Sequence, residues 1–275
     1  MPWMTLDAYQ KQDLDPRFKN RAKVISASKM VIYIGIDLLT TLGELHGKKH
    51  GKNQWCHADV KPQNLYLNRK RAKLAGEAKW REPIAPILKV GDLGLTCRAG
   101  SRLSAGTPGY MAPEQDGSGC VSPATDLFAV GQTIASMILG RPFDAEELKS
   151  VAHMKMTLAQ QIPSAHIVER IIKALRKMTY ATPTLRGNSE DSIRLLRSVL
   201  ASEEDWVILS LFMSQASADG ITSNEATDIL FDELASSRGW RNRTNERVAE
   251  LKSMIKSMYE RGILSRNGRK YTVRI

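Results

Sequence analysis

The chain has 275 residues, and its 40 lysines and arginines against 29 aspartates and glutamates give a formal net charge of +11. An apolar content of 42% and a charged content of 25% are ordinary for folded domains and exclude a disordered or fibrous protein. The longest apolar run, Met30 to Ile36, is too short to cross a bilayer, and Cys56, Cys97 and Cys120 fit neither a disulfide framework nor a zinc site. We therefore expect reduced thiols, a cytoplasmic location and no membrane association.

The first strong helical pattern runs from Ile32 to His46. Its apolar residues recur at the spacing of a helix with a buried face, at Ile32, Ile36, Leu39, Leu42 and Leu45. This predicted helix leads toward a polar segment, residues 57–64, that carries the most informative chemistry of the chain.

That segment reads His57-Ala58-Asp59-Val60-Lys61-Pro62-Gln63-Asn64. Asp59 can accept a proton from an attacking hydroxyl or orient it, Lys61 can offset charge on a migrating phosphoryl group, and Asn64 can hold Mg²⁺ through its side-chain oxygen. The segment resembles the catalytic loop of serine/threonine protein kinases, with the pattern HxDxKPxN. The resemblance implies ATP and Mg²⁺ as cofactors and a structural role for His57, which would fix the backbone of the loop.

A basic segment follows between Asn68 and Arg81. It holds Arg69, Lys70, Arg71, Lys73, Lys79 and Arg81, with Glu77 as its only acidic residue. We interpret it as an exposed insertion in a hairpin. It is either a solvated loop or a docking loop for an acidic substrate or nucleic acid.

Further motifs come in the order that the kinase family requires. A predicted strand, residues 87–90, precedes Asp92-Leu93-Gly94, which resembles the DFG motif and implies that Asp92 binds the magnesium ion of ATP. Leu93 keeps an apolar plug in the place of phenylalanine. The run from Gly106 to Gln115 is similar to the end of a kinase activation segment and includes an Ala-Pro-Glu triplet that ends at Glu114.

The resemblance also implies four structural residues. Thr107 would hydrogen-bond to Asp59 or Lys61, and Asp126, in a predicted helix that ends at Gly140, would anchor the backbone of the catalytic loop. Arg186 matches the arginine that forms a buried salt bridge with Glu114. Two more helices are predicted, at residues 167–180 and 192–200.

Parts of a complete kinase are missing from the sequence. It contains no GxGxxG loop and no strand lysine of the VAIK type before Asp59. Residues 1–9 resemble instead the hinge between the two lobes and the start of the following helix. We expect that Met1 is an internal methionine, a late start site or the boundary of a split gene. The small lobe would then come from upstream sequence or from a partner in trans.

A second module is predicted after a change of pattern near residue 200. Helices are expected around residues 206–212, from a cap at Ser223 to Gly239, and from Thr244 to Gly262. A hairpin with its turn at Asn267-Gly268 would follow. Three helices and a two-stranded wing resemble a winged helix-turn-helix domain.

The last 38 residues are strongly basic. Arg241, Arg243 and Arg247 would lie at the start of the third helix of this module, and Arg269 and Lys270 on its wing. In winged-helix domains these positions meet the major groove and the DNA backbone. A surface that docks a protein and a basic surface that binds nothing remain open alternatives.

The sequence thus predicts an α+β, mainly α, architecture: a kinase-like C-terminal lobe without the N-terminal lobe at residues 1–200, and a winged-helix-like domain at residues 201–275. The first functional hypothesis is a serine/threonine protein kinase that transfers the γ-phosphoryl group of ATP to a protein substrate, incomplete in this chain. The alternative is a catalytically silent, pseudokinase-like lobe that regulates a DNA- or protein-binding module.

Overall fold

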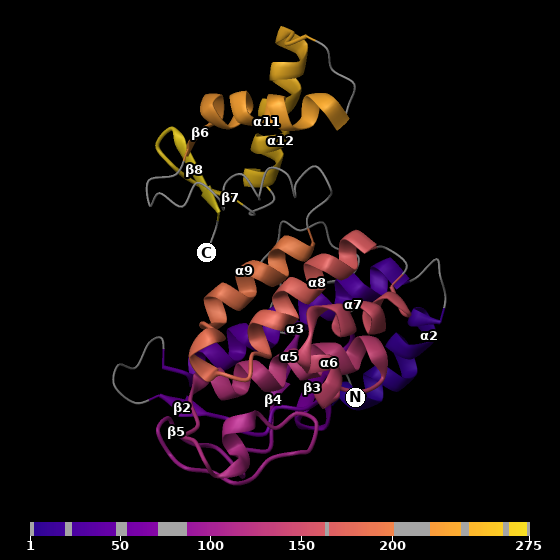
Figure 1. The fold of residues 1–275 in the computed structure, drawn as a ribbon, viewed down its shortest axis with the longest axis vertical. Helices are drawn as coiled ribbons and strands as arrows, with labels where there is room; N and C mark the ends of the chain where they lie inside the picture. Colours follow the sequence, from indigo (N-terminus) through magenta and orange to yellow (C-terminus); the bar gives the residue numbers. More distant parts are fainter. Residues whose placement is uncertain are drawn as a thin grey trace. The chain divides into compact units, whose positions relative to one another are not determined.

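Figure 1 shows a computed structural model of the chain, which describes residues 3–19, 24–47, 54–70, 87–162, 165–200, 221–237, 242–260 and 264–273. These residues form two compact units. The first holds the described residues from Trp3 to Val199, and the second holds Leu200 and the described residues from Ile221 to Val273. The described part of the chain is mainly helical with short strands, as the sequence predicts. None of its helices combines the length and the apolar character needed to cross a membrane.

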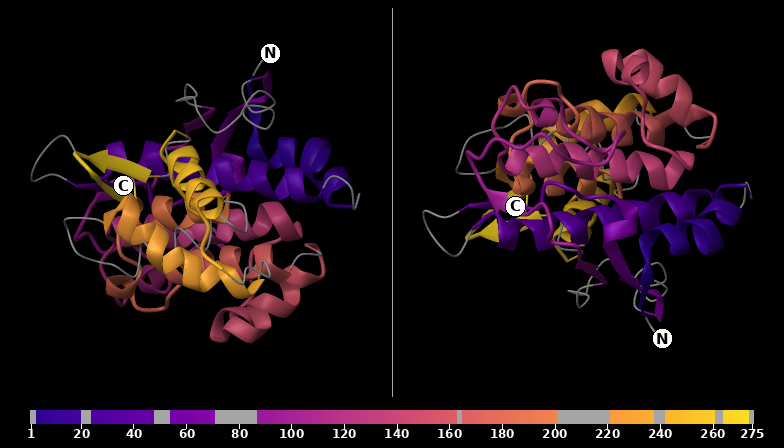
Figure 2. Two further views of the ribbon diagram at one scale, coloured as in Figure 1. Left: turned by 90° about the horizontal axis from the view of Figure 1, so that it is seen from above. Right: turned by 90° about the horizontal axis from the view of Figure 1, so that it is seen from below.

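The first unit is built on a long helix, α3 (Val24–Leu45). It packs against α5 (Pro123–Leu139) and α9 (Ser189–Val199), and α8 (Ala165–Met178) packs against both of these (Figure 1). The other described helices of the unit are short and border this group. They are α1 (Leu6–Tyr9), α2 (Asp15–Phe18), α6 (Ala145–Lys149) and α7 (Val151–Ala159). In both views of Figure 2, α3 and the pair α6 and α7 lie on opposite sides of this unit.

Helix α3 confirms the prediction of a buried helix but begins about two turns before Ile32. Ala27, Met30 and Val31 continue its buried face. The sequence pattern did not reveal this extension because Ser28, which is itself buried, interrupts the apolar residues.

Helix α5 also confirms its prediction. Ser122 and Pro123 begin it, and Gly140 ends it with a left-handed φ of 80°. Every residue from Thr125 to Ile138 is buried, so the helix is enclosed on all sides. Its position inside the unit gives Asp126 a rigid base. The helices predicted at residues 167–180 and 192–200 are α8 and α9, whose ends differ from the prediction by up to three residues.

Two small sheets lie in the first unit. The strands β1 (Trp3–Thr5), β3 (Leu65–Asn68) and β4 (Leu88–Val90) form an antiparallel sheet in the order β1-β3-β4. The predicted hairpin is therefore present as β3 and β4, and the part of the basic insertion from residue 71 to residue 81 lies outside the described residues. Strands β2 (Trp55–Cys56) and β5 (Cys97–Arg98) form a separate two-stranded ladder. The segment interpreted as a hinge contains β1. The last residue of this strand, Thr5, caps the N-terminus of α1.

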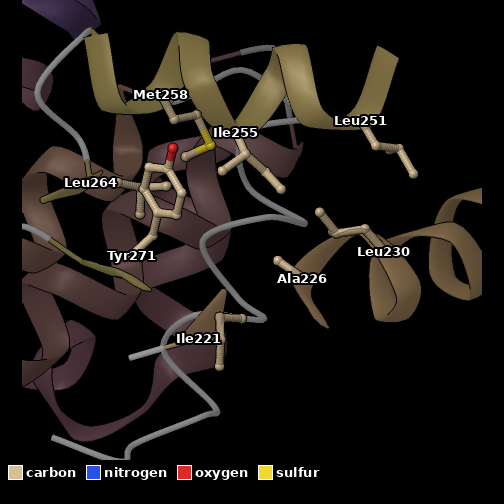
Figure 3. Close-up of a cluster of buried hydrophobic side chains, with 8 residues drawn as sticks. All are labelled: Ile221, Ala226, Leu230, Leu251, Ile255, Met258, Leu264 and Tyr271. Carbon is tan, nitrogen blue, oxygen red and sulfur yellow. The ribbon is translucent and has the colours of Figure 1, made fainter. Parts of the chain in front are cut away.

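The second unit has the order β6 (Ile221–Thr222), α11 (Ser223–Ser237), α12 (Asn245–Glu260), β7 (Leu264–Asn267) and β8 (Lys270–Val273). Its sheet has the order β6-β8-β7. Figure 3 shows Ile255 and Met258 of α12 pointing toward Leu264 and Tyr271 of the sheet. The unit thus has its own apolar core. The first helix predicted for this module, around residues 206–212, lies outside the described residues.

Two local predictions in this unit are wrong by one residue. The cap of α11 is Thr222 and not Ser223, because Thr222 and Glu225 form a reciprocal capping box: the Glu225 N–H donates to Thr222 Oγ1 at 3.3 Å and the Thr222 N–H to Glu225 Oε2 at 2.8 Å. The hairpin turn is Gly268-Arg269 and not Asn267-Gly268, because Asn267 pairs with Lys270. Gly268 has a φ of 60° at the first turn position, where a type II′ turn needs glycine.

Candidate active site

The backbone of residues 57 and 58 is held by a buried carboxylate on α5. Asp126, which is fully buried, accepts hydrogen bonds from the N–H groups of His57 and Ala58, both at 2.8 Å. His46 Nε2 lies 2.8 Å from the same carboxylate. Ala58 adopts a left-handed φ of 64°, a strained conformation for alanine that these bonds stabilise. Asp126 therefore has the contacts expected of a residue that anchors the backbone of the catalytic loop.

His57 connects the loop to the Asp92 segment. Its Nδ1 accepts a hydrogen bond from the Asp59 N–H at 3.3 Å, which leaves Nε2 as the protonated nitrogen that donates to Gly91 O at 2.9 Å. The ring is fully buried and both of its nitrogens are used. This geometry fits the structural role predicted for His57 and leaves no nitrogen for proton transfer.

Asp59, Lys61 and Thr107 form a closed set of polar contacts. Lys61 Nζ lies 2.8 Å from Asp59 Oδ2 and donates to Thr107 Oγ1 at 2.7 Å, and that hydroxyl donates to Asp59 Oδ1 at 2.7 Å. Asn64 adds a fourth member, because its Nδ2 donates to Asp59 Oδ2 and to Asp59 O, both at 2.9 Å. The structure thus brings together four of the residues selected from the sequence, from two segments far apart in the chain.

These contacts set the charge of Asp59. Burial on its own would raise the pKa of the carboxyl group, but the hydrogen bonds from Lys61 and Thr107 outweigh burial, and the pKa is lowered below its ordinary value. Asp59 is consequently a carboxylate at neutral pH. A carboxylate of low pKa is a weak base, so it is better suited to orienting a hydroxyl than to removing its proton early.

Asp92 lies beside the end of the β3–β4 ladder. The N–H of Gly91 donates to Asn64 O at 2.8 Å, so Asp92 follows directly after a residue that is bonded to the catalytic loop. Asp92 has a left-handed φ of 57°, and its exposed carboxylate receives a long bond of 3.4 Å from the Gly94 N–H. Ala58 and Asp92 are the two non-glycine residues with positive φ in the described parts of the chain, and both lie at this site.

Leu93 does not have the role predicted for it. Its exposed fraction is 61%, so it plugs no cavity within the described residues. Among the described residues of the first unit, none covers this side chain.

The remaining structural pair is buried as predicted. Arg186 donates to Glu114 at 2.6 and 2.8 Å, and its guanidinium group has no exposed surface. Its other N–H groups donate to the carbonyls of Tyr180, Ala124 and Ala181. All five donors of the guanidinium are therefore satisfied, which makes burial of the charge tolerable.

Sequence reasoning missed two residues that hold the site together. Gln115 donates to Ala58 O at 2.8 Å and Ala105 O at 2.9 Å, and accepts from the Ala112 N–H at 3.0 Å, so it joins the catalytic loop to the segment around Thr107. His46 was noted only as the end of a helix. A polar residue closing an apolar helix next to the key loop was the available signal for His46, whereas Gln115 gave no signal of its own.

The described basic residues of the second unit lie at the predicted positions, Arg243 and Arg247 at the start of α12 and Arg269 and Lys270 at the hairpin, but they differ in their contacts. Arg243 forms an ion pair with Asp228, and Arg247 donates to Asn242 O, so both are engaged within the unit. Arg269 and Lys270 are exposed at the hairpin. Arg241 lies outside the described residues.

Comparisons with known proteins agree with this geometry. Residues 2–206 match the model of the protein kinase domain. The chain is 28% identical over 161 residues to the serine/threonine-protein kinase nekl-2 of Caenorhabditis elegans, covering 57% of this chain and 40% of that protein. It is 34% identical over 102 residues to the serine/threonine-protein kinase ArnS of Sulfolobus acidocaldarius, covering 34% of this chain and 16% of that protein.

A third relative is the serine/threonine-protein kinase Pkn1 of Myxococcus xanthus, 35% identical over 107 residues, which cover 35% of this chain and 14% of Pkn1. The chain thus spans less than half the length of each of these three relatives. Because the match to the domain model extends over well over half of the sequence, this chain belongs to the protein kinase domain family.

Proposed function

We propose that the first unit carries out the large-lobe part of serine/threonine protein phosphorylation, the transfer of the γ-phosphoryl group of ATP to a protein hydroxyl. The observation that carries this proposal is the bonded set of Asp59, Lys61, Asn64 and Thr107. Asp59 would orient the hydroxyl of the substrate by accepting its hydrogen bond. Lys61, already fixed by Asp59 and Thr107, would face the transferred group with its positive charge.

The donor atoms of the site fit magnesium. Asn64 uses its side-chain nitrogen on Asp59, which leaves the amide oxygen as a ligand, and Asp92 offers an exposed carboxylate. No group of three or more histidine, cysteine or acidic residues that could enclose a metal occurs within the described residues. Two oxygen ligands suit Mg²⁺, which keeps waters and phosphate oxygens in its shell. When bound, Mg²⁺ would offset the charge of the nucleotide phosphates.

Transfer of ³²P from γ-labelled ATP to a generic serine/threonine substrate tests the kinase proposal. The sequence contains no GxGxxG loop, so a covering for the phosphates would have to come from a segment outside it. We expect slow transfer by this chain alone and faster transfer when a small-lobe segment is added. Equal rates for the wild type and the Asp59→Asn variant would contradict the proposal.

A second candidate function belongs to the second unit, and it stands even if the first unit is catalytically silent. We propose that residues 201–275 form a winged helix-turn-helix-like module, in a cytoplasmic protein, that binds nucleic acid through its wing. The order β6-α11-α12-β7-β8 and the sheet order β6-β8-β7 support this proposal. Because Arg243 and Arg247 are engaged within the unit, the wing residues Arg269 and Lys270 are the stronger candidates for phosphate contacts.

Replacing both wing residues with glutamine, in the full chain, is expected to weaken binding to duplex DNA. The slope of log K against log salt concentration should become shallower by about 2, roughly one unit for each lost phosphate contact. Fluorescence anisotropy of labelled DNA at several salt concentrations measures this slope.

The matched control replaces Lys11 and Lys149 with glutamine, which removes the same charge from exposed side chains of the first unit. If both double variants change the slope equally, general charge and not the wing causes binding. If the wild type ignores duplex DNA at low salt, the nucleic-acid proposal fails and protein docking becomes the better hypothesis.

A further inference from the structure

The β2–β5 ladder places two cysteines directly opposite each other. Its register pairs Trp55 with Arg98 and Cys56 with Cys97. The Arg98 guanidinium lies over the Trp55 ring, 5.5 Å from the ring centroid, so these two side chains share the outer face of the ladder. Since neighbouring residues of a strand point to opposite faces, both cysteines share the inner face. Cys56 is fully buried there, and Cys97 is half-buried.

The expected Cα separation of this pair lies in the range found for disulfide bonds. The Ala99 N–H donates to Gln54 O at 2.9 Å, which makes residues 54 and 99 a hydrogen-bonded pair. Because such pairs alternate along an antiparallel ladder, Cys56 and Cys97 are also a hydrogen-bonded pair, with an expected Cα separation of about 5.5 Å. Disulfides commonly join Cα atoms about 5.5–6 Å apart. The Cβ atoms of a hydrogen-bonded pair lie about 5.5 Å apart, whereas a disulfide needs about 3.5–4.5 Å, so the two short strands must approach each other by about 1 Å for the bond to form.

We propose that Cys56 and Cys97 form a reversible redox-modification site, in which an intrachain disulfide ties the strand that enters the catalytic loop to the strand that follows Asp92. The two strands bracket the whole candidate active site in the sequence. Cys56 precedes His57, whose N–H is bonded to Asp126, and Cys97 follows the Asp92-Leu93-Gly94 turn. The disulfide would fix these two ends of the site covalently.

A hydroperoxide is the oxidant that this chemistry needs. The Cys97 thiolate, which is the more exposed, attacks one oxygen of hydrogen peroxide, the O–O bond breaks, and hydroxide leaves and is protonated to water. The resulting sulfenic acid is attacked by the sulfur of Cys56, the S–S bond forms and a second water leaves. Two thiols are oxidised and one peroxide is reduced to two waters. Burial first, and the Asp126 carboxylate second, raise the pKa of Cys97, so the first step is slow.

Reversal is part of the proposal. In a compartment kept reducing by glutathione or thioredoxin, disulfides in folded proteins are transient and report on oxidation. A thiol would attack the Cys97 sulfur, which is the more accessible of the two, and restore both cysteines through a mixed disulfide. The free thiols of the described structure correspond to this reduced state.

The third cysteine provides a built-in control. Cys120 is exposed, lies outside the ladder and is nearer to Cys97 along the sequence than Cys56 is. In an unfolded chain the shorter loop closes more readily, so Cys97–Cys120 should be the favoured bond. In the folded chain the register of the β2–β5 ladder should instead favour the Cys56–Cys97 bond.

The experiment oxidises the full chain with hydrogen peroxide, once in native buffer and once in concentrated urea. Acid quenching, alkylation and mass spectrometry of a non-reducing digest then identify the linked peptides. In native buffer we expect a Cys56–Cys97 peptide pair that is lighter by two hydrogen atoms than the reduced peptides and is separated by dithiothreitol. The Cys120→Ser variant should form the same bond, and the Cys97→Ser variant should form none to Cys56.

Three results would overturn the proposal. The first is a native digest dominated by Cys97–Cys120, as in urea. The second is oxidation of Cys97 to sulfinic acid while Cys56 remains a thiol, and the third is the recovery of both cysteines unlinked. None of these results depends on kinase activity, so failure of this proposal is distinct from failure of the proposed function.

Discussion

Replacing Arg186 with methionine is expected to lower the free energy of unfolding of the first unit by about 3–5 kcal/mol. Arg186 has no exposed surface, and its loss leaves the buried carboxylate of Glu114 without its counter-charge. Only the hydroxyl of Thr125, which donates to Glu114 Oε1 at 2.8 Å, would remain as a partner among the contacts of this pair. Urea unfolding, with hydrogen exchange of peptides from α5 and α9 to locate the effect, measures the change.

Arg141 provides the matched control. Two of its guanidinium N–H groups donate to the carboxylate oxygens of Glu147, both at 2.7 Å, but its side chain is 51% exposed. Glu147 keeps bonds from Asp144 and Thr157 when Arg141 is removed. Arg141→Met should therefore cost no more than about 1 kcal/mol. Equal losses of stability in the two variants would mean that removing Arg186 does not leave Glu114 as an uncompensated buried charge.

Replacing Asp59 with asparagine is expected to reduce the rate of phosphoryl transfer by about 10²–10⁴-fold. Asparagine keeps the size of the side chain but loses the charge that would orient the substrate hydroxyl and that fixes Lys61 at 2.8 Å. Single-turnover transfer of ³²P at high protein concentration measures the rate even when turnover is slow. Asp116→Asn is the control, because Asp116 is an exposed acid in the same segment as Glu114 and should leave the rate unchanged.

The pH dependence of the rate gives a related check. The lowered pKa keeps Asp59 ionised when the pH falls below the ordinary aspartate value of about 3.9, so its protonation should not reduce the rate above that pH. Thr107→Val removes one of the hydrogen bonds that lower this pKa. The variant should therefore lose activity at a higher pH than the wild type does. An unchanged acid limb would show that Thr107 does not act on the charge of Asp59.

The parts of the site that are local in sequence could be predicted. Asp59, Lys61 and Asn64 lie within one short segment, so the motif alone identified groups that the fold brings into contact. Helices α3 and α5 could also be predicted, since each carries a long apolar pattern. The assignment of residues 1–200 and 201–275 to two domains stays a prediction, as do the chemical roles of the site residues.

Other features depend on register and on contacts between distant segments. Gln115 holds three backbone groups that no local pattern connects, and Leu93, which was expected to be an apolar plug, is exposed. Strands of two residues, such as β2 and β5, carry no periodicity, so the pairing of Cys56 with Cys97 was invisible in the sequence. The predicted hairpin turn was shifted by one residue because Gly268 suits the second position of a type I′ turn as well as the first position of a type II′ turn.

The most direct test of the account is the position of a divalent cation at the site. Crystals of the chain grown with ADP and Mn²⁺, which replaces Mg²⁺ and scatters anomalously, would locate the ion. We predict an anomalous peak about 2.1 Å from both the amide oxygen of Asn64 and a carboxylate oxygen of Asp92, and its loss in the Asp92→Asn variant. A cation bound elsewhere, with both of these oxygens beyond coordination distance, would contradict the proposed phosphotransfer site.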